Sequence, residues 1–253
     1  MINGVNMRVI AIANFKGGVG KSSVCMNLGA ALHQKGKKVL LIDLDPGAAL
    51  TYYALGQESE TVKCSSLDVL LEKVQPEAAA IEIKPGFSLV PADFELMTIE
   101  TARKGERSEL LKEALAGVRG FDYVLIDTPP AINIFTVMAI VASSRVYIVV
   151  NADMFSYRAM MTLEDVIKGL SRKVEMRIIV NLFDSRRNIE KEIFRDLKTK
   201  YSGKVFNSTI RRNVAIPEGV LLGLDVFSYR KSSPVAADFA TLAKEVIKKE
   251  EKN

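Results

Sequence analysis

Two lysines, three glycines and two serines lie close together near the N-terminus. Residues 16–23 read Lys-Gly-Gly-Val-Gly-Lys-Ser-Ser. They fit the end of the phosphate-binding pattern G-x-x-x-x-G-K-[ST], with Phe15 in place of the first glycine. A glycine-rich turn that leads into a helix points its N–H groups at one anion. The spacing therefore predicts a phosphate site formed by Gly17, Gly18, Val19, Gly20, Lys21, Ser22 and Ser23.

Lys21 and Ser22 are the residue types that a nucleoside triphosphate and its metal need. A lysine at this point pairs with the β- and γ-phosphates, and the hydroxyl that follows it binds Mg²⁺. Lys16 is a second lysine at the start of the same loop. Because one lysine is enough for the outer phosphates, Lys16 is either a solvated side chain or part of a site that another copy of the chain completes.

Two aspartates follow apolar segments that read as buried strands. Asp45 and Pro46 come after residues 38–43, and Asp127 ends residues 121–127. Ligands of an open parallel sheet bind at the carboxyl ends of its strands. Ionised aspartates there can hold metal-bound waters or orient the attacking water; the alternative is that each one caps its own strand end.

The elements that would position these residues alternate between strand and helix. Strands are expected at 8–14, 38–43, 121–127, 145–150, 176–181 and 204–206. Helices are expected at 22–34, 67–74, 100–115, 156–169, 189–201 and 234–249. Alternation over 253 residues without a linker predicts one α/β domain, in which helices flank both faces of a mostly parallel twisted sheet.

The net charge of +5 suits a polyanionic partner. The excess lies late in the chain, and its candidates for phosphate contacts are Arg186, Arg187, Arg211, Arg230 and Lys231. The alternative is a solvated helix face with paired charges, which the neighbouring acidic residues favour.

Other features indicate a cytoplasmic protein. No apolar run approaches the length of a membrane span, and residues 1–7 lack the basic and apolar regions of a signal peptide. Cys25 and Cys64 are too far apart in the sequence to indicate a disulfide framework or a metal pair. We read residues 1–253 as one domain, with 1–7 as a short extension and no N-terminal helix-turn-helix.

The motifs together resemble the ParA/MinD superfamily of P-loop ATPases. Residues 16–22 resemble its deviant Walker A motif, and Asp43-Leu-Asp45-Pro46 resembles its switch. Residues 121–130 resemble a Walker B strand with the Asp-x-Pro-Pro turn of ParA proteins, and residues 208–218 resemble the ParA stretch Ile-Pro-Arg-Asn-Val-Arg-Leu-Ser-Glu. The resemblance covers residues 8 to about 248.

The resemblance implies a Mg²⁺-dependent ATPase that forms ADP and phosphate. It implies that Lys16 reaches the nucleotide of a partner subunit, that Asp45 positions the hydrolytic water, and that Asp127 supports Mg²⁺ through water. Ser22 and Asp45 would join Asp127 around the metal, and Asn213 would lie against the base. Two departures affect these roles: Gly47-Ala48-Ala49 replaces the family's Gln-Gly-Asn, and Arg211 replaces its proline.

The function implied is DNA partitioning. An ATP-driven homodimer would bind DNA non-specifically, associate with the nucleoid, and be released when a ParB-like centromere-binding protein stimulates hydrolysis. The alternatives are a MinD-like membrane-cycling ATPase, an ATPase that positions a protein cargo, and an amidoligase or metal-insertion ATPase on the same scaffold. The polar chain end argues against a membrane anchor.

Overall fold

Parallel strands form the centre of the molecule. The computed structural model describes residues 7–99, 107–170 and 174–250. Within these residues, eight strands form one sheet in the order β3-β4-β2-β5-β1-β6-β7-β8, and every neighbouring pair is parallel except β3 and β4. The strands are β1 (Arg8–Ala13), β2 (Val39–Asp43), β3 (Ile81–Lys84), β4 (Phe87–Val90), β5 (Tyr123–Asp127), β6 (Arg145–Asn151), β7 (Glu175–Phe183) and β8 (Val205–Arg211).

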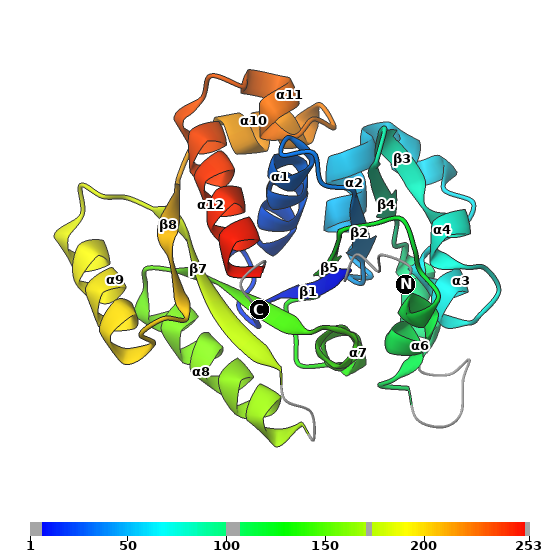
Figure 1. The fold of residues 1–253 in the computed structure, drawn as a ribbon, viewed down its shortest axis with the longest axis horizontal. Coiled ribbons are helices and arrows are strands. Elements are labelled where there is room, and N and C mark those ends of the chain that lie inside the picture. Colours follow the sequence, from blue (N-terminus) through cyan, green and yellow to red (C-terminus); the bar gives the residue numbers. More distant parts are fainter. Residues whose placement is uncertain (1–6, 100–106, 171–173, 251–253) are drawn as a thin grey trace, which may run out of the picture.

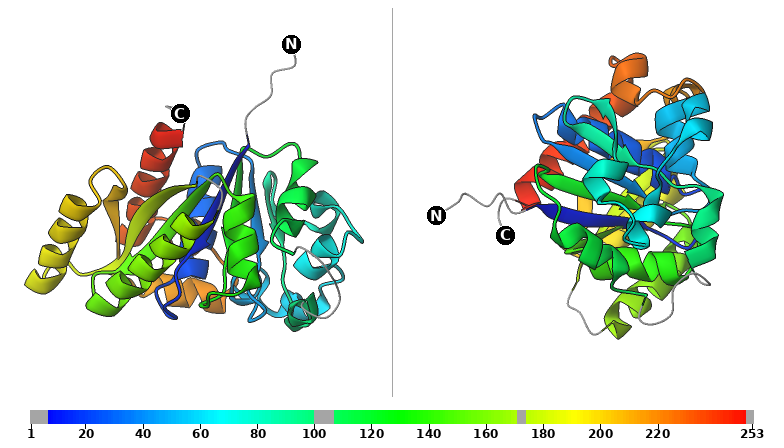
Figure 2. Two further views of the ribbon diagram at one scale, coloured as in Figure 1. Left: turned by 90° about the horizontal axis from the view of Figure 1, so that it is seen from below. Right: turned by 90° about the vertical axis from the view of Figure 1, so that its right-hand side faces the viewer.

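Helices cover both faces of this sheet (Figures 1 and 2). One face packs against α1 (Lys21–His33), α2 (Ala49–Leu55) and α12 (Pro234–Glu250), with α10 (Ala215–Leu221) and α11 (Val226–Arg230) beside them. The other face packs against α3 (Ser66–Leu70), α4 (Pro76–Ala79), α6 (Leu110–Ala116), α7 (Ile134–Ala142), α8 (Met154–Gly169) and α9 (Asn188–Lys200). The predicted fold class is therefore confirmed.

The alternation of side chains along each strand divides the core into two layers. In β1, Ile10 and Ile12 join the layer under α1 and α12, whereas Ala11 and Ala13 join the layer under α7 and α8. All four are fully buried. A strand covered on both faces is apolar throughout rather than alternating, which is why β1, β2 and β5 are visible as continuous apolar runs in the sequence.

The predicted elements agree best with the structure where they are long. Residues 22–34, 156–169, 189–201 and 234–249 match α1, α8, α9 and α12. The helix expected at 67–74 is shorter, because Glu72 has a left-handed φ of 60°. The strand expected at 204–206 continues to Arg211. Of the helix expected at 100–115, residues 100–106 lie outside the described part, and α6 occupies 110–116.

Candidate functional site

The predicted phosphate loop joins β1 to α1 at the carboxyl edge of the sheet. Gly18 and Gly20 have left-handed φ values of 74° and 89°, which glycine adopts without a Cβ penalty. A Cβ on Gly20 would lie 2.4 Å from Nδ2 of Asn181, at the end of β7. That amide donates a hydrogen bond to the Val19 carbonyl at 2.7 Å. The loop is thus seated directly on β7.

A second asparagine holds the beginning of the loop. Nδ2 of Asn14 donates to the Val149 carbonyl of β6 at 2.6 Å, and its Oδ1 accepts from the Lys16 N–H at 3.0 Å. Sequence reasoning missed both Asn14 and Asn181. The available signal was a polar side chain at the carboxyl end of an apolar strand, where a buried amide needs a partner.

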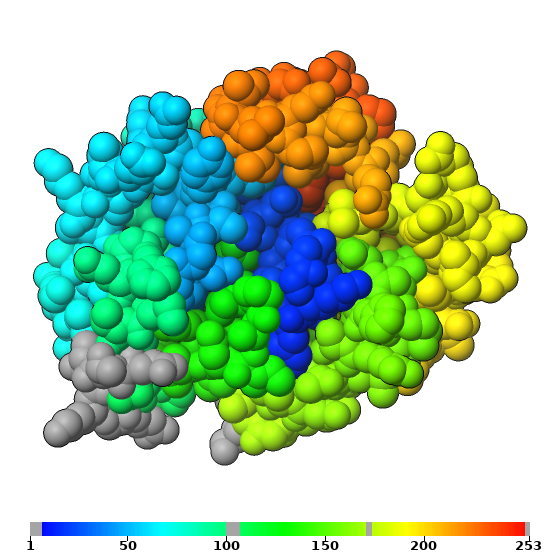
Figure 3. Space-filling model, turned by 180° about the vertical axis from the view of Figure 1, so that it is seen from behind, coloured from blue at the N-terminus to red at the C-terminus, as the bar shows by residue number. Residues whose placement is uncertain are grey.

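The loop encloses one cavity of about 300 Å³. Lys21, Ser22 and Asp45 line it together with Tyr53 of α2 and Val220 of α10. The remaining lining residues are Gly17, Gly18, Gly20, Ser23, Ala49 and Pro130. In Figure 3 the early part of the chain, in blue, lies at the centre of one face of the molecule. The Val19 side chain is fully buried in the core, so only its backbone can serve the predicted phosphate site.

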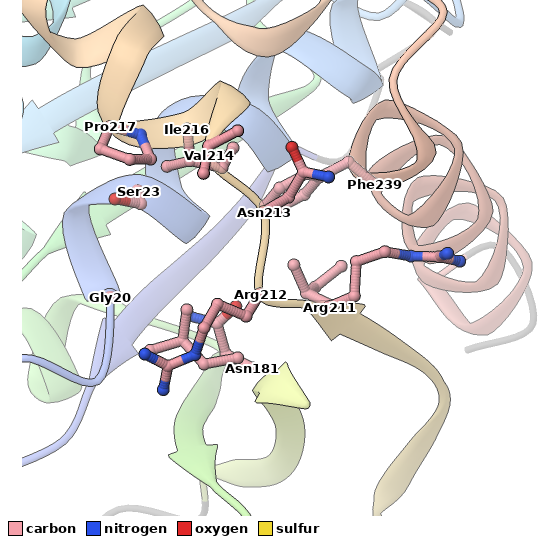
Figure 4. Close-up of a pocket in the computed structure, with 12 residues that line it drawn as sticks. Gly20, Ser23, Asn181, Arg211, Arg212, Asn213, Val214, Ile216, Pro217 and Phe239 are labelled. Atoms are coloured by element: carbon pink, nitrogen blue, oxygen red, sulfur yellow. The ribbon is translucent and has the colours of Figure 1, made fainter. Parts of the chain in front are cut away.

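A second cavity of about 360 Å³ adjoins the first (Figure 4). Gly20 and Ser23 line both cavities, so a ligand can extend from one into the other. The lining of this second cavity is mostly apolar. Asn213 lies in its wall, and its Oδ1 accepts from the Ala215 N–H at 2.9 Å. The other lining residues are Asn181, Leu182, Ile210, Arg211, Arg212, Val214, Ile216, Pro217 and Phe239.

Arg211, the residue that replaces the family's proline, does not fill this cavity. Figure 4 shows its side chain directed toward α12, where Nε lies 2.7 Å from Oδ2 of Asp238. The cavity therefore stays open beside Asn213 despite the larger side chain.

Two buried aspartates lie behind the phosphate cavity. Asp43 and Asp127 are register partners on the adjacent strands β2 and β5, and both are fully buried. Burial raises the pKa of Asp43 to about 6, against the hydrogen bonds from Asp45 and Thr51. Burial and the charge of Asp43 raise the pKa of Asp127 well above its usual value, although the nearby Ser22 hydroxyl and Lys21 ammonium oppose this.

The surroundings of Asp127 fit a divalent cation. Among the described residues, neither of its carboxylate oxygens has a hydrogen-bond partner, and a buried carboxylate without a partner is costly. Lys21 is also buried, and burial lowers its pKa although Asp127 and Asp45 act to raise it. Within ranges 7–99, 107–170 and 174–250, no three His, Cys, Asp or Glu side chains form a metal cage. The Asp127 carboxylate, which has no hydrogen-bond partner in the described part of the chain, suits Mg²⁺, which is usually held by few carboxylates together with waters and phosphates.

Lys16 lies apart from the other loop residues. Its Nζ is 2.9 and 3.0 Å from the two carboxylate oxygens of Asp153 and 3.2 Å from Oγ of Ser156. It also lies 5.8 Å from the centre of the Phe155 ring. Because Lys16 does not line the cavity of its own chain, the structure does not bring it together with Lys21 and Ser22.

The basic candidates are mostly paired with acids. Arg186 contacts Asp184 at 2.8 Å and Arg187 contacts Glu190 at 3.1 Å. Arg211 contacts Asp238, as described above, and Arg230 lies 3.6 Å from Glu218. Lys231 instead lines a shallow cavity between α1 and α12. The candidates do not form one cluster, since Figure 1 shows α9 and α11 well apart.

The apolar stripe near the chain end is packed inside the protein. Phe239, Leu242, Ala243 and Val246 of α12 are at most 1% exposed, and Ile247 packs against the same core. None of the described helices has the length and apolar character needed to cross a membrane.

Comparison with known proteins gives consistent matches over most of the chain. Residues 7–180 match the AAA_31 family, described as an AAA domain. The chromosome partitioning protein ParA of Caulobacter vibrioides is 34% identical, covering 96% of this chain and 95% of that protein. The chromosome-partitioning ATPase Soj of Thermus thermophilus is 33% identical, covering 95% and 96%.

A solved structure shares the fold. Cobyrinic acid a,c-diamide synthase from Mycobacterium smegmatis, crystallised with an ATP analogue and magnesium, is 29% identical with a TM-score of 0.81, covering 95% of this chain and 94% of that one.

Proposed function

This chain belongs to the ParA/Soj family of chromosome-partitioning ATPases, and from that membership we propose that it partitions DNA through an ATP-dependent dimer. It is an ATPase, with ATP as substrate and Mg²⁺ as cofactor. The observation that carries the proposal is the direction of Lys16, which points away from the phosphate cavity of its own chain. A cation that the loop supplies and its own site does not use can serve a partner's site once its contacts with Asp153 and Ser156 break.

In this proposal each residue of the site has one task. The loop N–H groups and Lys21 hold the phosphates. Ser22 and Asp127 would hold the magnesium ion, Asp127 through water, and the chemistry supplied there would be neutralisation of the charge on the phosphates. Asp45 lies at the cavity wall, where its carboxylate can orient the attacking water or a metal-bound one. Asn213 lies against the base in the adjoining cavity.

The dimer is the state that binds DNA. Two subunits present twice as many lysines and arginines as one, so ATP-driven closure raises affinity for a phosphate backbone without reading its sequence. Arg186, Arg187, Arg211, Arg230 and Lys231 are the candidates, and a ParB-like partner would stimulate hydrolysis and release the dimer. Nucleoid association then follows the ATP-bound state. Because four of the five cations are paired with acids, we expect modest affinity per subunit.

The experiment combines sedimentation with DNA binding. Asp45→Ala, which should block hydrolysis, is incubated with ATP and Mg²⁺, and its mass and its gel shift on random-sequence DNA are measured. We expect the Asp45→Ala protein to be a dimer that binds DNA. The double variant that also carries Lys16→Ala should be a monomer. A monomeric Asp45→Ala protein with ATP would refute the proposal.

Two alternatives are outcomes of the same experiment. Sedimentation with anionic liposomes tests membrane cycling, which the burial of the α12 stripe disfavours. A dimer that binds neither DNA nor liposomes would favour positioning of a protein cargo. An amidoligase reaction would instead make ATP hydrolysis depend on an amide donor and an acid substrate.

A further inference from the structure

Both ends of the loop after β2 are tied to the same buried carboxylate. Oδ1 of Asp43 accepts from the Asp45 N–H at 3.0 Å. Oδ2 accepts from the N–H and the hydroxyl of Thr51 at 2.9 and 2.8 Å. Thr51 is 1% exposed, and its Oγ1 also accepts from the Ala92 N–H, beyond β4, at 2.9 Å. The hydroxyl therefore links β2, α2 and the segment after β4.

The backbone between these ties is strained. Ala48 has φ 49° and ψ 34°, the left-handed region in which a Cβ costs free energy. Its N–H donates to the Asp45 carbonyl at 2.8 Å, and its carbonyl accepts from the Tyr52 N–H at 2.9 Å. The turn is tight as well, because a Cβ on Gly47 would lie 3.2 Å from Oδ1 of Asp45. Such a turn persists only where its surroundings hold it.

This turn holds the side chain of Asp45 in position. Its Oδ1 accepts from the Gly47 N–H at 2.9 Å, and its side chain lines the phosphate cavity. Thr51 does not line that cavity, although Ala49 and Tyr53 on either side of it do. Thr51 can therefore affect the reaction only indirectly, through groups that it contacts such as Asp43.

We propose that Thr51 is a positioning residue for ATP hydrolysis, which acts through Asp43 to hold the strained turn at Ala48 and so fixes the place of the Asp45 carboxylate. This inference rests on the proposed function, because it needs Asp45 to act on the water. It explains how the chain keeps an alanine at a position whose left-handed φ favours glycine.

The test replaces the hydroxyl with a methyl group of the same shape. Thr51→Val removes the hydroxyl that donates to Asp43 and accepts from Ala92, but keeps the backbone N–H that also donates to Asp43. Thr51→Ser retains the hydroxyl. We expect kcat for ATP hydrolysis to fall about tenfold in Thr51→Val, since one or two hydrogen bonds of positioning are lost. The Kd for a fluorescent ATP analogue should stay within about twofold, because Thr51 does not touch the ligand, and Thr51→Ser should recover the rate.

Ala48→Gly separates positioning from general stability. Glycine adopts the left-handed conformation without a Cβ penalty. The turn should therefore depend less on the contact between Thr51 and Asp43. We expect kcat of the double variant Thr51→Val, Ala48→Gly to be at least about threefold higher than that of Thr51→Val alone. Independent sites would not show this coupling. Where Thr51→Val does not fold, Thr51→Ala replaces it in the same cycle.

The outcomes are distinguishable. A wild-type kcat in Thr51→Val, measured well below its melting temperature, overturns the inference, and so does a loss of rate that Ala48→Gly leaves unchanged. Asp45→Ala is the control for the proposed function. If Asp45→Ala hydrolyses ATP at the normal rate, the assigned role of Asp45 is wrong and this inference is wrong with it. If Asp45→Ala is inactive and Thr51→Val is normal, only the positioning role of Thr51 is wrong.

Discussion

Replacing Asp153 with asparagine should release Lys16 for dimerisation. In the single subunit, Lys16 contacts both carboxylate oxygens of Asp153 and the hydroxyl of Ser156. These contacts must break before Lys16 can reach a partner's nucleotide. Asparagine removes the charge but keeps the helix cap, because its amide oxygen can still accept the Ser156 N–H that Asp153 now accepts at 2.8 Å.

The size of the effect follows from the exposure of the pair. The side chains of Lys16 and Asp153 are 31% and 36% exposed, so the pair belongs with partly screened surface ion pairs and is worth about 1 kcal/mol. A symmetric dimer breaks two such pairs, which is about 2 kcal/mol and corresponds to a roughly 30-fold tighter dimer dissociation constant. The effect should shrink as salt is added.

The effect should also be independent of pH near neutrality. Burial acts to raise the pKa of Asp153, but the hydrogen bonds from Ser156 and Lys16 outweigh it and lower the pKa. A group with a depressed folded pKa keeps its contribution above its unfolded pKa, near 4, and loses it only in acid. The ion pair is therefore intact between about pH 6 and pH 8.

Sedimentation equilibrium with ATP and Mg²⁺, in an Asp45→Ala background, measures the dimer constant. The matched control is Asp165→Asn, which removes one negative charge from an exposed position of the same helix. We expect the dimer dissociation constant to fall in Asp153→Asn and to stay unchanged in Asp165→Asn. An unchanged constant, or equal tightening in the control, would refute the reasoning.

Three further predictions concern single buried groups. Lys21→Ala removes the cation of the phosphate cavity, so affinity for a fluorescent ATP analogue should fall by about 100-fold or more; retained affinity would contradict the loop assignment. Because the pKa of Asp43 is raised to about 6, its stabilising contribution is full below about pH 4, and about 3 kcal/mol is lost as the pH rises through 6. Urea unfolding without nucleotide should show this loss, and Asp43→Asn should show a smaller one, because Asp127 remains as a buried carboxylate with a raised pKa. Glu250→Ala removes a carboxylate that contacts Tyr147 and Arg145 at 2.9 Å and should lower the free energy of unfolding by about 3 kcal/mol; an unchanged urea midpoint would argue against it.

The parts of the site that follow from local spacing could be predicted from the sequence. The loop at 16–23 and the strands that end at Asp43 and Asp127 need only consecutive residues to be recognised. The short elements could not: β3 and β4 have four residues each, and α7 is apolar on nearly all sides. An apolar run of that length has no periodicity that separates a strand from a buried helix.

Contacts between distant segments were also out of reach. The sequence gives no sign that Asn181 supports Gly20, or that Asp153 binds Lys16, because each pair is more than a hundred residues apart. Such partners are decided by strand order, in this case by β6 and β7 following β1 in the sheet. Only a prediction of the topology would have identified them.

The two side chains proposed to act in the closed dimer, those of Lys16 and Asp45, both contact groups of their own chain. Lys16 is held by Asp153, and the Asp45 carboxylate accepts the N–H of Gly47. The first contact must break for a second subunit to be engaged, whereas a carboxylate that accepts one N–H can still accept a hydrogen bond from a water. Because the release of Lys16 costs free energy that bound nucleotide and a partner subunit would have to offset, hydrolysis under the proposed function would require the closed pair. Under the proposed function, slow hydrolysis by a single subunit is then the expected consequence.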